Sequence, residues 1–315
     1  MNTIHSLRLA TLLFLLAGIS TAQACDFCNC LAAINPWYNG SSSAALHVMI
    51  QRAVHGSSAP GSFIKSAALD GIEHGGHDHE GDSTALSTEM RTTFELSGRW
   101  QVSPEVMITA ALPLVLIHAD EVAAQGIGDP RIMAYYVVRD SLLSSALLLG
   151  GGVALPLGTV DLRGSDGSPL PANEQPGTQA FTAMADVTAQ TRLGGWSLTA
   201  NVLGRLPFPD GNRNRRGTSI VASGSVGHDL LRSNEQEMAL IGTAGLRCES
   251  ATHDRVADQE DAASGFTSLY AQLGGQLVLG SVRVEAATMI PLASRRPDGS
   301  PQEQARIVGG VRYQF

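Results

Sequence analysis

Apolar and polar residues alternate with a period of two along much of this 315-residue chain. Between Glu89 and Trp100, every odd position holds a charged or hydroxyl-bearing residue, and the even positions are mostly apolar, with Phe94 and Leu96 among them. Successive side chains of a β-strand point to opposite faces of a sheet. The alternation therefore predicts strands with one polar face and one apolar face.

Twelve segments of this kind can be placed along the chain. They cover residues 44–55, 85–99, 105–117, 128–139, 144–157, 179–193, 195–207, 217–229, 237–248, 266–279, 281–292 and 304–315. The connections between them alternate between long and short over most of the chain, which assigns them to opposite ends of a sheet. The last segment has Val311, Tyr313 and Phe315 on one face and is expected to close the sheet.

An antiparallel barrel explains both the even number of strands and the two classes of loop. In lipid, every backbone amide and carbonyl must be hydrogen-bonded within the protein, so a sheet in a membrane has to close on itself. The sequence thus predicts an all-β fold, an antiparallel transmembrane β-barrel of about 12 strands with short periplasmic turns and long extracellular loops. A soluble β-sandwich, the competing fold, would not separate its loops by length.

The N-terminal residues have the composition of a secretory signal. His5 and Arg8 precede an apolar run, 9–19, which is too short to span a bilayer and is followed by a small-x-small motif ending at Ala24. The net charge of −8 argues against nucleic acid as a partner. We expect a signal peptide at 1–24, a periplasmic segment at 25–43, and a barrel at 44–315 embedded in the lipid of a Gram-negative outer membrane.

Three stretches near the start of the predicted barrel form a recurring pattern: SPEVMITAALPLV, QGIGDPRIMAYYVV and GGGVALPLGTV. A strand ending in Leu-Pro, a Gly-x-Gly-Asp turn and a strand ending in Pro-x-Gly follow one another between residues 103 and 160. This arrangement resembles the outer-membrane, transporter-like family named after meta-pathway phenol degradation. The resemblance implies the barrel fold and a transport role, and it says little about the cargo.

The first long connection, residues 56–84, is rich in histidine and acid. Its candidate metal ligands are His74, His77, Asp78, His79 and Glu80. Imidazole and carboxylate groups bind Zn²⁺, Cu²⁺ or Ni²⁺. The loop is therefore a candidate metal site at the cell surface, and the alternative is a solvated acidic loop that binds nothing.

Three cysteines, Cys25, Cys28 and Cys30, lie at the start of the predicted periplasmic segment, and the fourth is Cys248. The periplasm is oxidising, so one disulfide with a spare thiol is one interpretation. The odd count also fits a thiolate site for a soft ion such as Cu⁺, or a lipid on Cys25. All three alternatives stay open, and the segment is also a candidate docking site for a periplasmic partner.

The polar faces of the predicted strands would line the lumen. They mix acids with arginines, which predicts cross-strand ion pairs inside the barrel. The excess of arginine would favour anions on any path through it. The predicted lumen-lining residues are Glu89, Arg91, Glu95, Arg99, Asp129, Arg131, Asp186, Arg283, Glu285 and Arg312.

These features predict a channel or transporter for a small solute. A more specific hypothesis is that the protein handles a transition metal. The alternative is a non-transporting structural barrel, or one that binds metal at its surface. Catalysis is not expected, because the serines near His228 and the pair Ser250 and His253 have no third residue to orient the histidine. The glycines at 126 and 128 precede a strand rather than a helix, so they do not form a phosphate loop.

Overall fold

The computed structural model describes residues 42–55, 87–119, 122–140, 145–163, 175–233, 237–262, 264–297 and 302–315. Twelve long strands dominate these ranges: β1 (Ser43–His55), β2 (Ser87–Gln101), β3 (Val106–Ala119), β5 (Arg131–Asp140), β6 (Ser145–Ala154), β7 (Thr182–Leu193), β8 (Trp196–Pro207), β9 (Ser219–Ser233), β10 (Met238–Ala251), β13 (Phe266–Leu279), β14 (Val282–Arg295) and β16 (Arg306–Gln314). No helix in the described ranges has the length and apolarity needed to cross a membrane.

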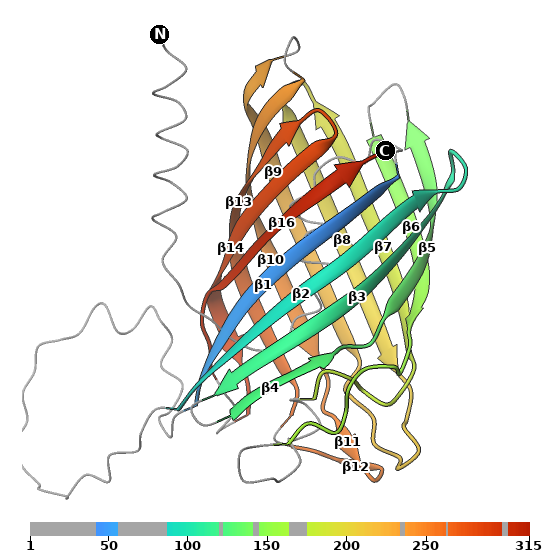
Figure 1. The fold of residues 1–315 in the computed structure, drawn as a ribbon, viewed down its shortest axis with the longest axis vertical. Helices are drawn as coiled ribbons and strands as arrows, with labels where there is room; N and C mark the ends of the chain where they lie inside the picture. The colour runs from blue at the N-terminus through green and yellow to red at the C-terminus, as the bar shows by residue number, and fades with distance from the viewer. Residues whose placement is uncertain are drawn as a thin grey trace, which may run out of the picture.

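Antiparallel pairing joins each long strand to its neighbours and closes the sheet (Figure 1). The closing pairs are β1 with β16 and β16 with β14. Ser43 at the start of β1 lies opposite both Arg99 of β2 and Gln314 of β16. Because the ring is complete, the long strands leave no open edge for lipid to meet. The predicted all-β antiparallel barrel of twelve strands is confirmed.

The two ends of the barrel differ in the length of their connections. Residues 194–195 and 280–281 are two-residue turns, in which Gly194 and Gly280 have φ angles of 61° and 55°. Two-residue hairpins need positive φ to match the twist of their strands, and glycine adopts it without strain. The long connections lie at the opposite end, at the bottom of Figure 1, whereas β1 begins and β16 ends at the short-turn end.

Four short strands at the long-loop end were not predicted from the sequence. β4 (Val122–Ile127) extends the pairing of β3, and β15 (Gln302–Glu303) pairs with the end of β1. β11 (Arg255–Val256) and β12 (Gln259–Glu260) form a separate hairpin. Three of these strands have only two residues, which is too few to show a period, and β4 lies in a stretch interpreted as a connection.

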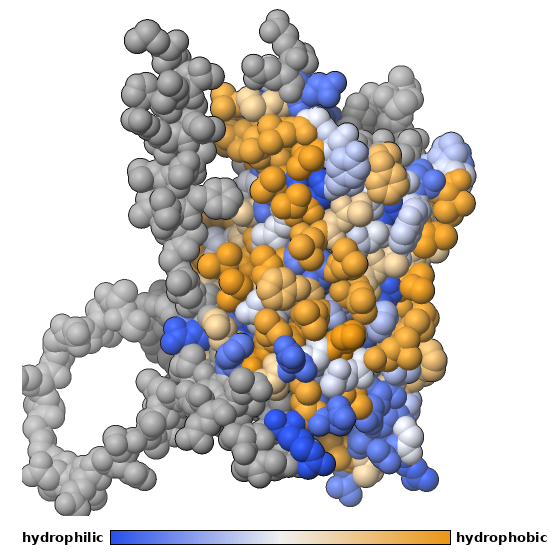
Figure 2. Space-filling view, in the orientation of Figure 1, coloured by the Kyte–Doolittle hydropathy of each residue, from blue (hydrophilic) through white to orange (hydrophobic). Residues whose placement is uncertain are grey.

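The outer wall of the barrel is apolar. Burial alternates residue by residue along much of β7 and β8, with exposed positions on the outside. Large exposed side chains on the barrel strands include Leu96, Trp100, Val202, Leu246 and Tyr313. Figure 2 shows apolar residues spread over the strands, with hydrophilic residues gathered at the long-loop end. Hydrocarbon accommodates such a surface, whereas water does not, so this wall suits a lipid bilayer.

Replacing Val202 with arginine should destabilise the barrel. Val202 lies at the middle of β8 on the outer wall and is 48% exposed. An arginine at the bilayer midplane costs about 2–4 kcal/mol, which guanidinium unfolding in lipid vesicles would measure. The matched control is Val256→Arg in the β11–β12 hairpin, where Val256 is 56% exposed and the expected change is below about 0.5 kcal/mol. Equally small changes in both variants would contradict a lipid-facing wall.

Candidate functional site

Charged residues gather on the inside of the barrel. Six predicted lumen-lining residues are buried there: Arg91, Glu95, Arg131, Asp186, Arg283 and Glu285. Arg99 and Arg312 are partly buried. Arg131 of β5 reaches across β3 to form an ion pair with Glu95 of β2. Glu89 lies within β2, but its side chain is outside the described part of the structure.

Asp129, also predicted to line the lumen, bonds to the long connection between β6 and β7. It lies just before β5, where Pro130 has no N–H group to extend the strand. Its Oδ1 accepts a hydrogen bond from the backbone N–H of Gly158 at 2.9 Å, and its Oδ2 accepts from the N–H and hydroxyl of Thr178 at 2.9 and 2.6 Å. Asp129 therefore holds the long connection between β6 and β7 against the end of the barrel.

The largest ionic cluster is centred on Arg306 of β16. Its guanidinium donates to both carboxylate oxygens of Glu249 at 2.8 and 3.0 Å, to Glu303, and to the hydroxyl of Tyr270 at 2.8 Å. Arg247 donates to Glu249 as well. Arg306 and Arg247 are at most 1% exposed, so these charges depend on one another for compensation.

None of the five residues of this cluster was among the predicted lumen-lining residues. The alternation was present for four of them, because Arg247 and Glu249 alternate with Leu246 and Cys248, Tyr270 lies between Leu269 and Ala271, and Arg306 has the parity of Arg312. Glu303 belongs to a two-residue strand and had no period to reveal it. The pairing of Glu249 with Arg306, 57 residues away, depends on the barrel order.

Glu285 of β14 is the centre of a second cluster, nearer the short-turn end. Its Oε1 lies 3.0 Å from Nε2 of His47 and 3.6 Å from Nη2 of Arg312, and its Oε2 accepts from Gln276 at 3.3 Å. Glu285 and Gln276 are each 1% exposed. A single buried carboxylate thus interacts with side chains from β1, β13 and β16.

Arginines outnumber acids around Glu285. Arg283 and Arg312 lie directly opposite each other in the register of β14 and β16, and Arg99 lies on β2, the strand on the far side of β1. Like charges directly opposite on one face of a sheet repel each other. Arg283 and Arg312 therefore bring two like charges together beside Glu285, which lies 3.6 Å from Arg312.

Apolar side chains share the interior with these clusters. Met133, Ala154, Met184 and Leu203 form a buried cluster across β5 to β8. A second cluster packs Met49, Ala287, Met289 and Val308 against Tyr270. Polar and apolar surfaces therefore both face the inside of the barrel.

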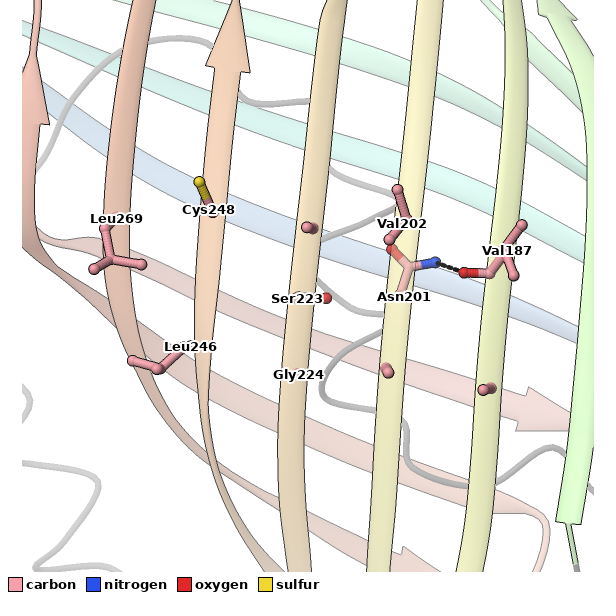
Figure 3. A pocket seen from close by; sticks show the side chains of 11 residues that line it. Val187, Asn201, Val202, Ser223, Gly224, Leu246, Cys248 and Leu269 are labelled. Atoms are coloured by element: carbon pink, nitrogen blue, oxygen red, sulfur yellow. Dashed lines mark hydrogen bonds between the residues drawn. The ribbon is translucent and has the colours of Figure 1, made fainter.

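Cys248 lies on the outer wall. Its exposed side chain lines an apolar groove of about 340 Å³ together with Val202, Leu246 and Leu269 (Figure 3). Leu246 and Cys248 face outwards because Arg247 and Glu249, their neighbours in β10, face inwards. The groove belongs to the lipid-facing surface and not to the lumen.

The predicted metal ligands lie outside the described residues. These are Cys25, Cys28 and Cys30, and His74, His77, Asp78, His79 and Glu80. In the part of the chain that is described, no group of three or more His, Cys, Asp or Glu side chains is arranged to hold a metal ion. The metal sites stay predictions from the sequence.

The fold is similar to that of a solved outer-membrane channel. The COG4313 outer membrane channel from Pseudomonas putida F1 matches with a TM-score of 0.64 at 11% identity, over 88% of this chain and 96% of that chain. A weaker match is the beta domain of the Bordetella autotransporter BrkA, with a TM-score of 0.48 at 12% identity, over 87% of this chain and 100% of that chain. Another is the KdgM porin in complex with disordered oligogalacturonate, with a TM-score of 0.39 at 10% identity, over 73% of this chain and 96% of that chain. No family model matches the sequence, and no curated protein does.

At 11% identity, the match to the channel establishes a shared fold. The chain has the architecture of an outer-membrane β-barrel. The narrower resemblance to the meta-pathway phenol degradation family stays a prediction, since no family model matches.

Replacing Arg306 with methionine should strongly destabilise the barrel, because it removes the guanidinium that Glu249 and Glu303 share and leaves each buried carboxylate with one arginine, Arg247 or Arg296. Removing one partner of a buried ion pair costs about 3–5 kcal/mol, which guanidinium unfolding would measure. The control is Arg213→Met, because the side chain of Arg213 is 79% exposed and pairs with Asp258 at 3.5 Å; its loss should be below about 1 kcal/mol. A similar loss in both variants would show that the Arg306 cluster is solvated.

Proposed function

We propose that this protein is an outer-membrane channel for a small solute. The observation that carries the proposal is a closed twelve-strand barrel with an apolar outer wall and charged residues inside. The similarity in fold to an outer membrane channel supports it. Lipid surrounds the outer wall, and the solute passes on the inside.

The charges inside the barrel favour anions. Arg283 and Arg312 lie opposite each other on β14 and β16, and Arg99 lies on β2, all near the short-turn end of the lumen. Rings of arginine in a pore attract anions and repel cations. Bacterial barrels have short turns on the periplasmic side, so this positive region faces the periplasm.

Planar bilayer recordings would test both parts of this proposal. The wild-type protein should give discrete conductance steps, and its reversal potential in a KCl gradient should have the sign of chloride selectivity. The double variant Arg283→Gln with Arg312→Gln should shift the reversal potential towards zero, because it removes two cations from the path. Arg213→Gln, at an exposed site outside the lumen, should leave the reversal potential unchanged.

If the protein never conducts, the channel proposal is wrong. The alternatives are then a structural barrel or a barrel that binds a ligand at its surface. Conductance with an unchanged reversal potential in the double variant would overturn the proposed role of the arginines alone.

Metal handling is the second candidate function, and the composition of two segments favours it. His74, His77 and His79, with Asp78 and Glu80, would capture Zn²⁺, Cu²⁺ or Ni²⁺ at the cell surface. Cys25, Cys28 and Cys30 would bind or sense a soft ion on the periplasmic side, or dock a periplasmic partner.

Metal titration would test the surface loop. Isothermal calorimetry of the full chain with Zn²⁺, Cu²⁺ and Ni²⁺ should show binding that falls by at least about tenfold when residues 73–82 are deleted, since the deletion removes three imidazoles. Replacing Cys25, Cys28 and Cys30 with serine separates the contribution of the thiols. Identical binding by the full chain and the deletion variant would rule out the loop as a metal site.

A further inference from the structure

The apolar groove beside Cys248 is a hollow in the lipid-facing wall of the barrel. It extends over β7, β8, β9, β10 and β13 and has a volume of about 340 Å³. Figure 3 shows Gly224 between Leu246 on one side and Val202 on the other. The outward side chains of a barrel normally cover its wall, so the hollow has to arise from the sizes of the residues at this place.

Small residues form the floor of the groove. Ala189 of β7, Ala200 of β8 and Gly224 of β9 lie opposite one another in the strand register, and all three are exposed on the outer face. Ala222, the next outward residue of β9, also lines the groove. Side chains directly opposite on one face of a sheet are neighbours. These four positions therefore leave one continuous hollow.

Larger outward side chains border the row of small residues. Val187 and Val202 lie opposite each other on the side of the long loops and are 47% and 48% exposed. Leu198 and Val226 form the corresponding row on the side of the short turns. Leu246 of β10 stands where the row of small residues ends, and it is 53% exposed. The groove is thus a hollow with apolar flanks.

The position of the groove decides what kind of molecule can fill it. Its flanking side chains belong to the wall that contacts lipid, so the groove opens towards hydrocarbon. Water enters a hollow only where polar groups hold it, and an unfilled hollow forfeits the dispersion contacts of the atoms that line it. An alkyl chain in the groove would contact protein on three sides, whereas a chain on the neighbouring wall contacts it on one side.

A second copy of this chain fits the groove less well. A stable protein interface involves about 20–30 residues on each side, whereas 11 residues line the groove. A two-fold dimer would also place the same surface of both copies together. The hollow would then face another hollow and stay unfilled.

We propose that this groove binds one acyl chain of a membrane lipid and retains it longer than the rest of the barrel wall retains its lipids. The chain lies on Ala200 and Gly224, between the flanks that include Val202 and Leu246. The inference goes beyond the channel function and does not depend on it, because the groove is on the outside of the barrel.

Native mass spectrometry of the full chain, released from detergent micelles with palmitoyl-oleoyl phosphatidylethanolamine added, would test the inference. The wild-type protein should keep one lipid at a collision energy that removes the others. Gly224→Leu fills the floor of the groove, so the lipid-bound fraction should fall by at least about fivefold. A Cβ built at Gly224 lies 4.0 Å from the nearest listed neighbour, the backbone oxygen of Thr199, so the position has space for a side chain.

Gly204→Leu is the matched control. Gly204 lies on β8, two residues beyond Val202 and on the same outward face, but it does not line the groove. A Cβ there also lies 4.0 Å from the nearest backbone oxygen. This variant adds the same side chain to the same wall and should keep the lipid. Ala222→Leu is a second floor variant and decides if Gly224→Leu does not fold, which heat-dependent mobility in gels would show.

Glycerophosphoethanolamine, which has the head group but no acyl chains, should not bind. Its binding would overturn the inference, and so would equal lipid retention by the wild-type protein and the folded floor variants. An equal loss of lipid in Gly204→Leu would also overturn it. A wild-type dimer that Gly224→Leu dissociates would instead assign the groove to a second copy of the chain. A barrel that retains the lipid but never conducts would leave this inference standing and overturn the channel.

Discussion

Closure of the backbone hydrogen-bond ring between β1 and β16 is the constraint on which the other features depend. A sheet that contacts lipid cannot leave amides and carbonyls unpaired at an edge. Once the ring is closed, each strand has one face towards lipid and one towards the interior. Leu46 of β1 is 56% exposed, for example, whereas its neighbour His47 is 3% exposed. Every charge on the strands then has to be accommodated inside.

The buried charges are compensated differently in different parts of the interior. Around Arg306, two glutamates, a tyrosine and a second arginine form a compact network in which the buried charges are compensated. Around Glu285, arginines predominate. At Asp186 the balance is reversed, because the carboxylate is held by neutral groups.

The strands and their two faces could be predicted from the sequence because alternation is a local signal. Residues 89–100 show it plainly, and Met90, Leu96 and Trp100 are all exposed on the outside. The contacts of Asp129 could not be predicted, because parity does not reveal that Gly158 and Thr178 lie beside it. Parity placed most members of the Arg306 network on inward faces, but it could not show that Arg306 meets Glu249 three strands away. The neutral surroundings of Asp186 were invisible for the same reason, since Asn201 belongs to the next strand.

The seam between β1 and β16 also has a consequence for folding. These strands pair residues as far apart as Ser43 and Gln314, so no partly synthesised chain can make this contact. Until it forms, the sheet is a ribbon with two unsatisfied edges, which invite pairing with other chains. Contacts so distant in sequence also form slowly. Sealing of this seam therefore ends the interval in which the unclosed ribbon can pair with other chains.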